Sequence, residues 1–400
     1  MKHKILILPA AILVVILFYY PKWNNAELDV HPLTRSWDIA IPNQDVPEGL
    51  NSLSAEECGT CHIEHYREWE TSTHAHAWTD KQFQAEIRKE SSPFMCINCH
   101  IPLQNQQEFI VTGLVGGDIY QPVMEENPYY DKALQQEGIT CASCHVRNGT
   151  IIGTTGSPNA AHKTVKDVEF LSEHLCISCH NANAELTPEV VCTFQTGEEW
   201  VAGPYFGVKN CVDCHMETLN RENTIGFGDT LSHLHNFAGS GIPKSNTHDA
   251  VGLNGLAIYS SDIKHTFKTN EEIIYTLSVV NALAGHSVPT GDPERFFDFS
   301  FVLRNEQGDT IVTKTERIGE KWQWYPVAKK LSDNNLEPGE KRTFTFSHTP
   351  ELAGKLILSV VITKHRLAKE YADYNKLKED YPLYITIFNK EYQIEVSPLP

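Results

Sequence analysis

The sequence predicts an α+β protein built from two unlike halves behind a hydrophobic N-terminal helix. Three observations indicate this organisation. The length of 400 residues exceeds that of a usual single domain, all eleven cysteines lie before residue 251, and the remainder has the texture of β-strands. We expect a mainly α-helical, loop-rich domain over residues 51–250 and an all-β sandwich over residues 251–400.

Composition and charge limit the possible classes of protein and partner. Hydrophobic residues at 41% and charged residues at 21% are typical of a globular chain, which excludes a disordered, collagenous or polytopic membrane protein. The 33 basic and 51 acidic residues give a net charge of −18, so nucleic acid is not an expected partner. The acidic excess falls in the first 250 residues, so the two halves differ in chemistry.

The N-terminus predicts an export segment. Two lysines precede an uncharged run over residues 5–20, and aromatic residues follow it as at a membrane interface. We interpret residues 1–23 as an uncleaved signal anchor in the inner membrane, with a cleaved signal peptide as the alternative. This orientation places the rest of the chain on the periplasmic side of a bacterial inner membrane. Residues 24–50 are polar and rich in proline, so we expect a linker there.

Ten of the eleven cysteines belong to five copies of the motif Cys-x-x-Cys-His. A redox dithiol or half of a zinc site also uses two cysteines at this spacing, but neither requires a histidine at the next position. Five repeats with histidine make the motif that of c-type haem attachment. The cysteines are Cys58, Cys61, Cys96, Cys99, Cys141, Cys144, Cys176, Cys179, Cys211 and Cys214, and the histidines are His62, His100, His145, His180 and His215.

The motif predicts a pentahaem domain over residues 51–250. Two cysteines about one helical turn apart can reach both vinyl groups of one porphyrin, and the adjacent histidine then binds the iron. Five sites therefore imply five covalently attached haems. A compact unit of this length has a radius of gyration of about 16 Å, so the haems must lie close enough for electrons to pass between them.

Five irons need five further axial ligands, and histidine is the residue that can supply them. The chain has four methionines, of which Met1 is the initiator and two others adjoin attachment motifs. Fourteen of the nineteen histidines lie outside the motifs. We therefore expect mostly bis-histidine, low-spin haems, whose reduction potentials are lower than those of haems with one methionine ligand.

The first motif and the residues after it resemble the opening of cytochrome c554-like multihaem cytochromes. Their pattern is Cys-x-x-Cys-His followed by Tyr66, Trp69, Ser72 and His74. Further similarities lie near the third, fourth and fifth motifs, so the resemblance spans residues 54–240. That group is similar in haem packing to pentahaem nitrite reductases and octahaem hydroxylamine oxidoreductases. The resemblance implies that the distal ligands include His74, His162 and His235.

The assignment of the remaining distal ligands stays open. Each of the implied histidines could also be an ordinary surface or core residue. Further candidates for an axial position are His65, His76, His174, His233 and His248. Cys192 stands outside the motifs, and we expect it to be a buried, inert thiol.

The residues after 250 predict an immunoglobulin-like β-sandwich. About seven apolar or alternating runs in 150 residues are separated by turn segments, which is typical of that fold. A short helix is expected within residues 367–377. The predicted strands are residues 256–263, 272–283, 296–304, 310–318, 342–348, 355–363 and 383–396.

One loop of this half has a sequence that indicates a functional role in addition to a structural one. Residues 285–291 have the sequence Gly-His-Ser-Val-Pro-Thr-Gly and resemble a loop in β domains that follow c554-like haem domains. The resemblance implies that His286 reaches across and binds a haem iron, and the alternative is a turn histidine at the interface. Arg295 nearby could then pair with a haem propionate.

Two functions remain open from the sequence. The first is electron transfer in a respiratory chain, between a quinol-linked donor or other cytochromes and an exported acceptor. The second is an enzyme that acts on a small nitrogen or sulfur compound at one five-coordinate haem. All five motifs end in histidine, whereas pentahaem nitrite reductases usually replace one of these histidines by lysine. We therefore favour electron transfer.

Overall fold

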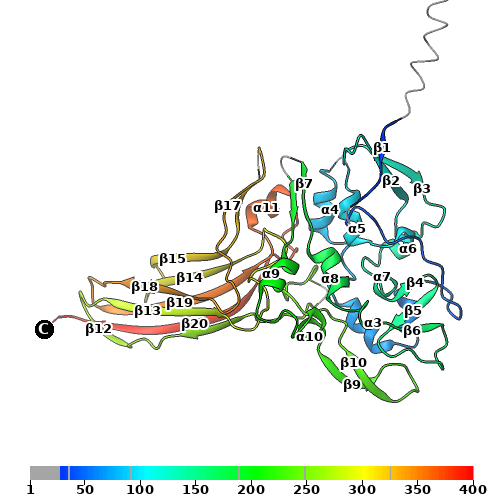
Figure 1. Cartoon of the computed structure of the whole chain (residues 1–400). Helices are drawn as coiled ribbons and strands as arrows, with labels where there is room; N and C mark the ends of the chain where they lie inside the picture. The colour runs from blue at the N-terminus through cyan, green and yellow to red at the C-terminus, as the bar shows by residue number, and fades with distance from the viewer. Residues whose placement is uncertain are drawn as a thin grey trace, which may run out of the picture.

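A computed structural model describes residues 28–34, 37–90, 92–187, 190–246, 249–324 and 326–399. The cysteine-rich half (residues 51–250) and the β half (residues 251–400) lie side by side, and the C-terminus lies at the far tip of the β half (Figure 1). The predicted signal anchor falls outside the described residues. Within these ranges, no helix has the length and apolar character that crossing a bilayer requires.

The helices of the cysteine-rich half are short and begin at local caps. Ser54 caps the first of them by accepting the backbone N–H of Glu56 at 3.1 Å. Asn210 and Asp213 form a reciprocal capping box at the last. The helices are α2 (Ala55–Gly59), α3 (Ile63–Glu70), α4 (Lys81–Ile87), α5 (Phe94–His100), η1 (Gln104–Gln106), α6 (Lys132–Gln135), α7 (Cys141–His145), α8 (Glu173–His180), α9 (Thr196–Ala202) and α10 (Cys211–His215).

Small sheets accompany these helices, so the prediction of a mainly α-helical first half was only partly right. The half is loop-rich as expected, but no sheet in its described part has more than three strands. The three-stranded sheets are β1 (Val30–His31) with β2 (Phe109–Val115) and β3 (Pro122–Glu126), and β4 (Val146–Arg147) with β5 (Thr150–Gly153) and β6 (Thr164–Lys166). The hairpins are β7 (Asn183–Thr187) with β8 (Val190–Thr193), and β9 (Thr218–Glu222) with β10 (Asp229–His233).

The β half contains a three-stranded and a five-stranded sheet with one shared core. Their orders are β11-β13-β18 and β12-β20-β19-β14-β15. All seven predicted runs overlap strands, and the predicted short helix is α11 (Lys369–Tyr374). The strands are β11 (Leu256–Ser260), β12 (Thr266–Lys268), β13 (Ile273–Asn281), β14 (Phe296–Asn305), β15 (Thr310–Gly319), β16 (Lys321–Gln323), β17 (Lys329–Ser332), β18 (Lys341–His348), β19 (Gly354–His365) and β20 (Tyr384–Ser397).

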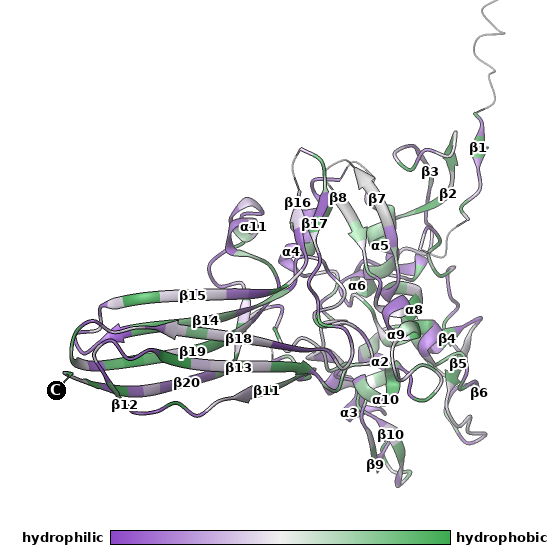
Figure 2. Cartoon of the chain, turned by 60° about the vertical axis from the view of Figure 1, so that its left-hand side comes forward, coloured by the Kyte–Doolittle hydropathy of each residue, from purple (hydrophilic) through white to green (hydrophobic). Residues whose placement is uncertain are grey.

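The alternation of side chains builds the core between these sheets. In β18, Phe344 and Phe346 are buried while the threonines beside them are exposed. Phe346 packs with Phe301 of β14, and both rings are fully buried. Each such ring stabilises the fold by about 1.5–3 kcal/mol relative to an exposed position. The colours of Figure 2 show hydrophobic and hydrophilic stretches succeeding one another along these strands. The pattern supports a sandwich, and its immunoglobulin-like topology stays a prediction.

Polar contacts fix the loop between β13 and β14 against the cysteine-rich half. The carboxylate of Glu199 on α9 accepts the backbone N–H of Ser287 at 3.2 Å and the hydroxyl of Thr290 at 2.7 Å. Gly203 lies so close to Gly285 that a Cβ on Gly203 would stand 2.0 Å from the carbonyl oxygen of Gly285. The β half therefore presents this loop to the first half in one defined position.

Candidate haem-binding site

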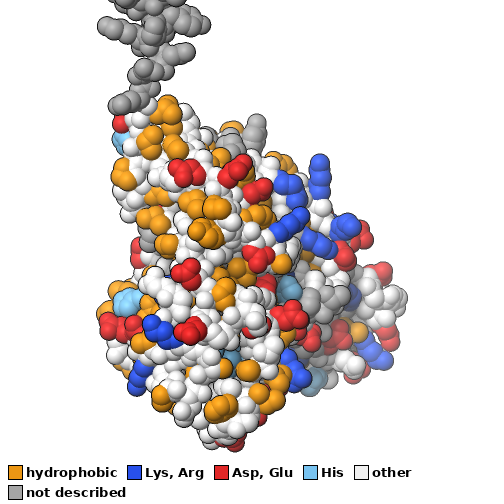
Figure 3. Space-filling view, turned by 90° about the vertical axis from the view of Figure 1, so that its right-hand side faces the viewer, with side chains coloured by type: hydrophobic (Ala, Val, Ile, Leu, Met, Phe, Trp, Pro, Cys, Tyr) orange, Lys and Arg blue, Asp and Glu red, His pale blue; other side chains and the backbone are white. Residues whose placement is uncertain are grey.

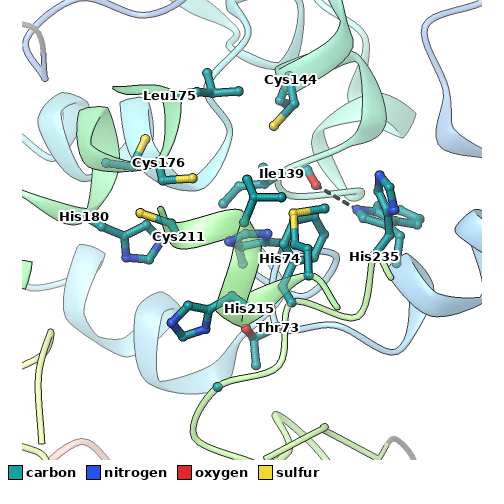
Figure 4. A pocket seen from close by; sticks show the side chains of 18 of the residues that line it. Thr73, His74, Ile139, Cys144, Leu175, Cys176, His180, Cys211, His215 and His235 are labelled. Atoms are coloured by element: carbon teal, nitrogen blue, oxygen red, sulfur yellow. Dashed lines mark hydrogen bonds between the residues drawn. The ribbon is translucent and has the colours of Figure 1, made fainter. Parts of the chain in front are cut away.

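A single large cavity occupies the centre of the cysteine-rich half and extends to the β half. Its volume is about 3530 Å³, several times the roughly 300–1,000 Å³ of a pocket for one small ligand. Residues of all five motifs line it, together with His286. Figure 4 shows cysteine sulfurs and histidine rings from separate segments directed toward this common space.

Short helices position the attachment motifs. The second and fourth motifs form the C-terminal ends of α5 and α8, whereas the third and fifth motifs make up the whole of α7 and α10. The first motif begins in α2. One helical turn places the two cysteines of a motif on the same side of the helix. All eleven cysteines are free of disulfide bonds. The thiols are therefore available for two bonds to one macrocycle at each motif.

Backbone carbonyls fix the tautomer of most motif histidines. The ring Nδ1 of four of them lies within hydrogen-bond distance of a carbonyl oxygen, and an Nδ1–H that donates there leaves the lone pair on Nε2 for a metal. The contacts are His62 to Asn223 at 2.7 Å, His100 to Ala77 at 2.7 Å, His145 to Ile152 at 2.8 Å and His215 to Ala238 at 2.6 Å.

Four motif histidines each face a second histidine at nearly the same separation. Two imidazoles that bind one metal from opposite sides, each about 2.0 Å from it, have ring centroids roughly 6 Å apart. The observed centroid separations are 6.4 Å for His62 and His162, 6.3 Å for His180 and His74, 6.1 Å for His145 and His235, and 6.2 Å for His215 and His286.

These residues fit a haem iron between the two rings of each pair. His74, His162 and His235 are the histidines that the resemblance implied, and His286 comes from the loop of the β half. Two of the second histidines also hold Nδ1 near a carbonyl oxygen: His235 lies 2.9 Å from that of His233, and His286 lies 2.8 Å from that of Ser287.

Burial keeps these rings in the neutral form that binds metals. It lowers the pKa of His74 and His235 to about 3. Burial likewise lowers the pKa of His100 and His180 to about 4. Because a metal competes with protons for the ring nitrogen, a ring that stays neutral near pH 7 is ready to bind iron.

The histidine of the second motif has a different neighbour. His100 stacks on Phe83, with ring centroids 3.5 Å apart and an interplanar angle of 5°. Among the described residues, no histidine ring faces His100 at the separation of the other four pairs. The second motif is therefore the one motif for which the described residues provide no second histidine.

The remaining candidate histidines have other surroundings. His65 lies 4.8 Å from His235 in an edge-on arrangement, and its Nε2 is 3.0 Å from the hydroxyl of Ser232. His233 holds its Nδ1 2.9 Å from the carbonyl oxygen of Met216. His174 lines the cavity. The backbone carbonyl oxygen of His76 accepts the N–H of Asp80. His248 lies outside the described residues.

The cysteines of different motifs meet inside the cavity. Cys58 lies beside Cys141, Cys99 lies beside Cys179, and Cys176 lies beside Cys211. Cys144 lies near both cysteines of the fourth motif. The first motif therefore adjoins the third, and the fourth motif adjoins the second, third and fifth. Figure 4 shows the sulfurs of Cys176 and Cys211 beside each other.

Several charged residues around the cavity were missed by the sequence analysis. Lys244, Lys364 and Arg366 line it near the β half, and Asp80 lies among them. They are single charges in ordinary polar segments, with no spacing or motif that marks them. Only the fold brings them together.

The comparisons with known proteins agree with this site. Residues 57–115, which contain the first two motifs, match the family model described as cytochrome c554 and c-prime. The crystal structure of a penta-heme cytochrome c552 from Thermochromatium tepidum has a TM-score of 0.59 at 16% identity, covering 87% of this chain and 100% of that chain. These matches support a multihaem cytochrome c with covalently bound c-type haem.

Other comparisons add little to this result. The crystal structure of the CARDB domain of the PF1109 protein from Pyrococcus furiosus is 16% identical over 36% of this chain and 94% of that chain, with a TM-score of 0.20. Similarity at that level carries no conclusion about the β half. No curated protein matches the chain.

Proposed function

We propose that this multihaem cytochrome transfers electrons through five covalently bound haems in a respiratory chain on the periplasmic side of the bacterial inner membrane. One observation carries the proposal: four histidine pairs stand at the separation of axial ligands around one cavity. An iron with two histidine ligands has no open position for a substrate, which favours electron transfer over catalysis.

The proposed ligand sets follow from the pairs. His62 with His162, His145 with His235, His180 with His74, and His215 with His286 would each hold one iron. His100 would hold the fifth. When bound, the haems supply one-electron transfer between neighbouring irons. The protein's part is to orient the rings through the carbonyl contacts and to keep water away from the cavity.

The route for electrons follows the contacts between attachment motifs. The first and third motifs adjoin, the third adjoins the fourth, and the second and fifth both adjoin the fourth. We propose a branched path with the fourth site at the branch point. Its outer ends are the first, second and fifth sites.

The surface and the N-terminus support proposals about partners. Figure 3 shows carboxylates and apolar side chains interspersed on the end of the molecule that the cysteine-rich half forms. The first and fifth sites are two outer ends of the proposed path, and Cys61 and Cys214 of their motifs line the cavity. We propose that redox proteins, a quinol-linked donor or other cytochromes, dock near these sites, and that residues 1–23 anchor the chain in the membrane.

The surroundings of His100 favour a second candidate function. If the second iron lacks a distal histidine, it is five-coordinate and open to a small molecule. The chain would then be an oxidoreductase of a small nitrogen or sulfur compound, with the other four haems delivering electrons. Phe83 stacked on His100 is the observation that keeps this candidate open.

Spectroscopy of the mature holoprotein tests both functions. We expect five haems per chain from the pyridine haemochrome spectrum and at least four low-spin ferric haems by electron paramagnetic resonance. A fifth low-spin signal and no binding of cyanide or nitric oxide would support electron transfer alone. A high-spin haem that binds cyanide would support the enzyme, and a colourless product would contradict both.

A further inference from the structure

Four cations gather where the cavity meets the β half. Lys244 comes from the segment before the β half, and Arg295 comes from the loop before β14. Lys364 lies at the end of β19, and Arg366 directly follows that strand. All four line the cavity, and we call them the boundary cations. Their positive charges lie next to one another, since each of Lys244 and Lys364 feels the charge of Arg295.

Two carboxylates accompany the boundary cations. Asp80 accepts hydrogen bonds from Lys244 and from the hydroxyl of Tyr381, and it lies 3.9 Å from Arg366. Asp292 precedes Arg295 in the same loop, and its carboxylate favours the charged form of the Arg295 guanidinium. Burial raises the pKa of Glu294, whose carboxylate accepts a hydrogen bond from Gln82 at 3.1 Å and forms no ion pair with a boundary cation in the described part of the chain. Two carboxylates, Asp80 and Asp292, therefore accompany the four cations.

The two outer cations, Arg295 and Lys364, form few hydrogen bonds. Arg295 donates one hydrogen bond, to the carbonyl oxygen of Thr290 at 3.3 Å, although a guanidinium carries five N–H groups. Lys364 donates only to the carbonyl oxygens of Ser240 and Leu253. In the described part of the chain, neither forms an ion pair with a carboxylate.

Cations that line an apolar cavity without an ion pair favour an anionic partner. Burial and the neighbouring Arg295 lower the pKa of Lys364 to about 8, a sign that its surroundings penalise the charged form. A buried cation is stable when an anion pairs with it and accepts its hydrogen bonds. Arg295 and Lys364 can each pair with one carboxylate, and a haem carries two propionate carboxylates.

We propose that the boundary cations bind the two propionates of the haem attached at Cys176 and Cys179. Arg295 supplies a bidentate partner for one carboxylate, and Lys364 pairs with the other. Arg295 donates to the carbonyl oxygen of Thr290, and the hydroxyl of Thr290 lies 2.8 Å from that of Thr196 on α9. The same helix is tied to the residue after His180, because the backbone N–H of Glu198 donates to Asn181 at 3.1 Å, so these contacts place Arg295 near the fourth site. The inference rests on the proposed function, since it requires that haem to be present.

The proposal gives the β half an electrostatic role at the branch point. A positive charge near an iron favours the reduced state, which carries one more electron. Removing the charge of Arg295 or Lys364 should therefore make that haem harder to reduce. The β half would then set the reduction potential at the site through which the other sites connect.

Redox titration of full-length holoprotein variants tests the proposal. We expect Arg295→Gln and Lys364→Gln each to lower the equilibrium constant for reduction of one haem about tenfold, which is about 59 mV for a one-electron couple. The other four components should keep their potentials. Arg295→Lys retains the charge and should stay close to the unchanged protein.

Matched controls lie at the far end of the same strands. Lys355 and Lys364 both belong to β19, and Arg304 lies at the end of β14 that is distant from Arg295. Lys355→Gln and Arg304→Gln should leave all five potentials unchanged. If either neutral variant fails to accumulate, the other still reports on the same carboxylate pair.

The outcomes separate this proposal from the proposed function. Five haems with unchanged potentials in both Arg295→Gln and Lys364→Gln would overturn the propionate assignment and leave electron transfer standing. Equal shifts in the control variants would also overturn it, because the effect would then be one of net charge. A wild-type protein without the fourth haem would refute both proposals.

Discussion

At the scale of single residues, the site depends on how each imidazole is held. The sequence pattern predicted the motif histidines, and the resemblances implied all four rings that face them. It could not indicate the carbonyl oxygens that fix Nδ1, such as that of Ala238 beside His215, because any residue carries a carbonyl. The sequence also could not show which motif histidine each of these rings faces, because the two histidines of a pair come from segments far apart in the chain.

His286 allows the most direct test of a ligand pair. Replacing it by alanine removes the ring that faces His215 at 6.2 Å, so one iron should lose a ligand and become high-spin. Electron paramagnetic resonance of the ferric protein measures this change. His265→Ala is the control, because His265 lies in the β half beside the carbonyl oxygen of Gln393 and faces no motif. An unchanged spectrum for His286→Ala would show that the ring is not a ligand.

Asp80 should be important for stability. Burial alone would raise the pKa of its carboxyl, but Lys244 and Arg366 beside it hold that pKa below its usual value. Asp80→Ala leaves both cations without their acid, so we expect a loss of roughly 3–5 kcal/mol in the free energy of unfolding. Chemical denaturation measures the loss, and a change under about 1 kcal/mol would contradict the expectation.

The same residue predicts a pH dependence. A carboxyl whose pKa is lower in the folded than in the unfolded state stabilises the fold above its unfolded pKa, and the stabilisation is lost as the pH falls through the folded pKa. The difference in unfolding free energy between wild type and Asp80→Ala should therefore be full at pH 7 and shrink below about pH 4. A difference that stays constant over this range would argue against an ionised Asp80.

At the scale of elements, prediction succeeded where the core fixes the pattern. Alternation such as Thr343 to Phe346 marked the strands of the β half because one face of each packs in the core. In the cysteine-rich half, an attachment motif needs only about one helical turn, and the buried hydrophobic side chains form small separate clusters in a half that also holds the large cavity. The lengths of the helices there therefore cannot be predicted from the spacing of apolar residues, and the sequence analysis missed the small sheets.

The contact between α9 and the loop of His286 gives a test at this scale. In Gly203→Ala the new Cβ would meet the carbonyl oxygen of Gly285 at 2.0 Å, so the loop must move. We expect a high-spin fraction like that of His286→Ala, measured in the same spectra. Gly153→Ala is the control, because a Cβ there meets no atom within 4 Å. Normal low-spin spectra for Gly203→Ala would show that the loop tolerates the shift.

At the scale of the whole molecule, the two halves complete one another. The β half supplies His286 and most of the boundary cations, whereas the cysteine-rich half supplies the attachment motifs and Asp80. The difference in charge between the halves was visible in the sequence. That oppositely charged residues from both halves meet at the cavity follows only from the fold.

The proposed membrane anchor is testable on the intact protein. Mass spectrometry of the mature chain should find residues 1–23 retained, and the protein should remain with the membrane fraction at high salt, because an apolar anchor is insensitive to ionic screening. A mature N-terminus near residue 25 would instead indicate a cleaved signal peptide.

The contacts of the fourth motif have a consequence for damage. Among the described cysteines, only those of this motif lie near three other motifs, so in the proposed path every route between the first, second and fifth sites crosses it. If one of the outer haems were lost, electrons could still pass among the other four. If the fourth were lost, the remaining haems would form three separate groups, and no electron could pass from one group to another.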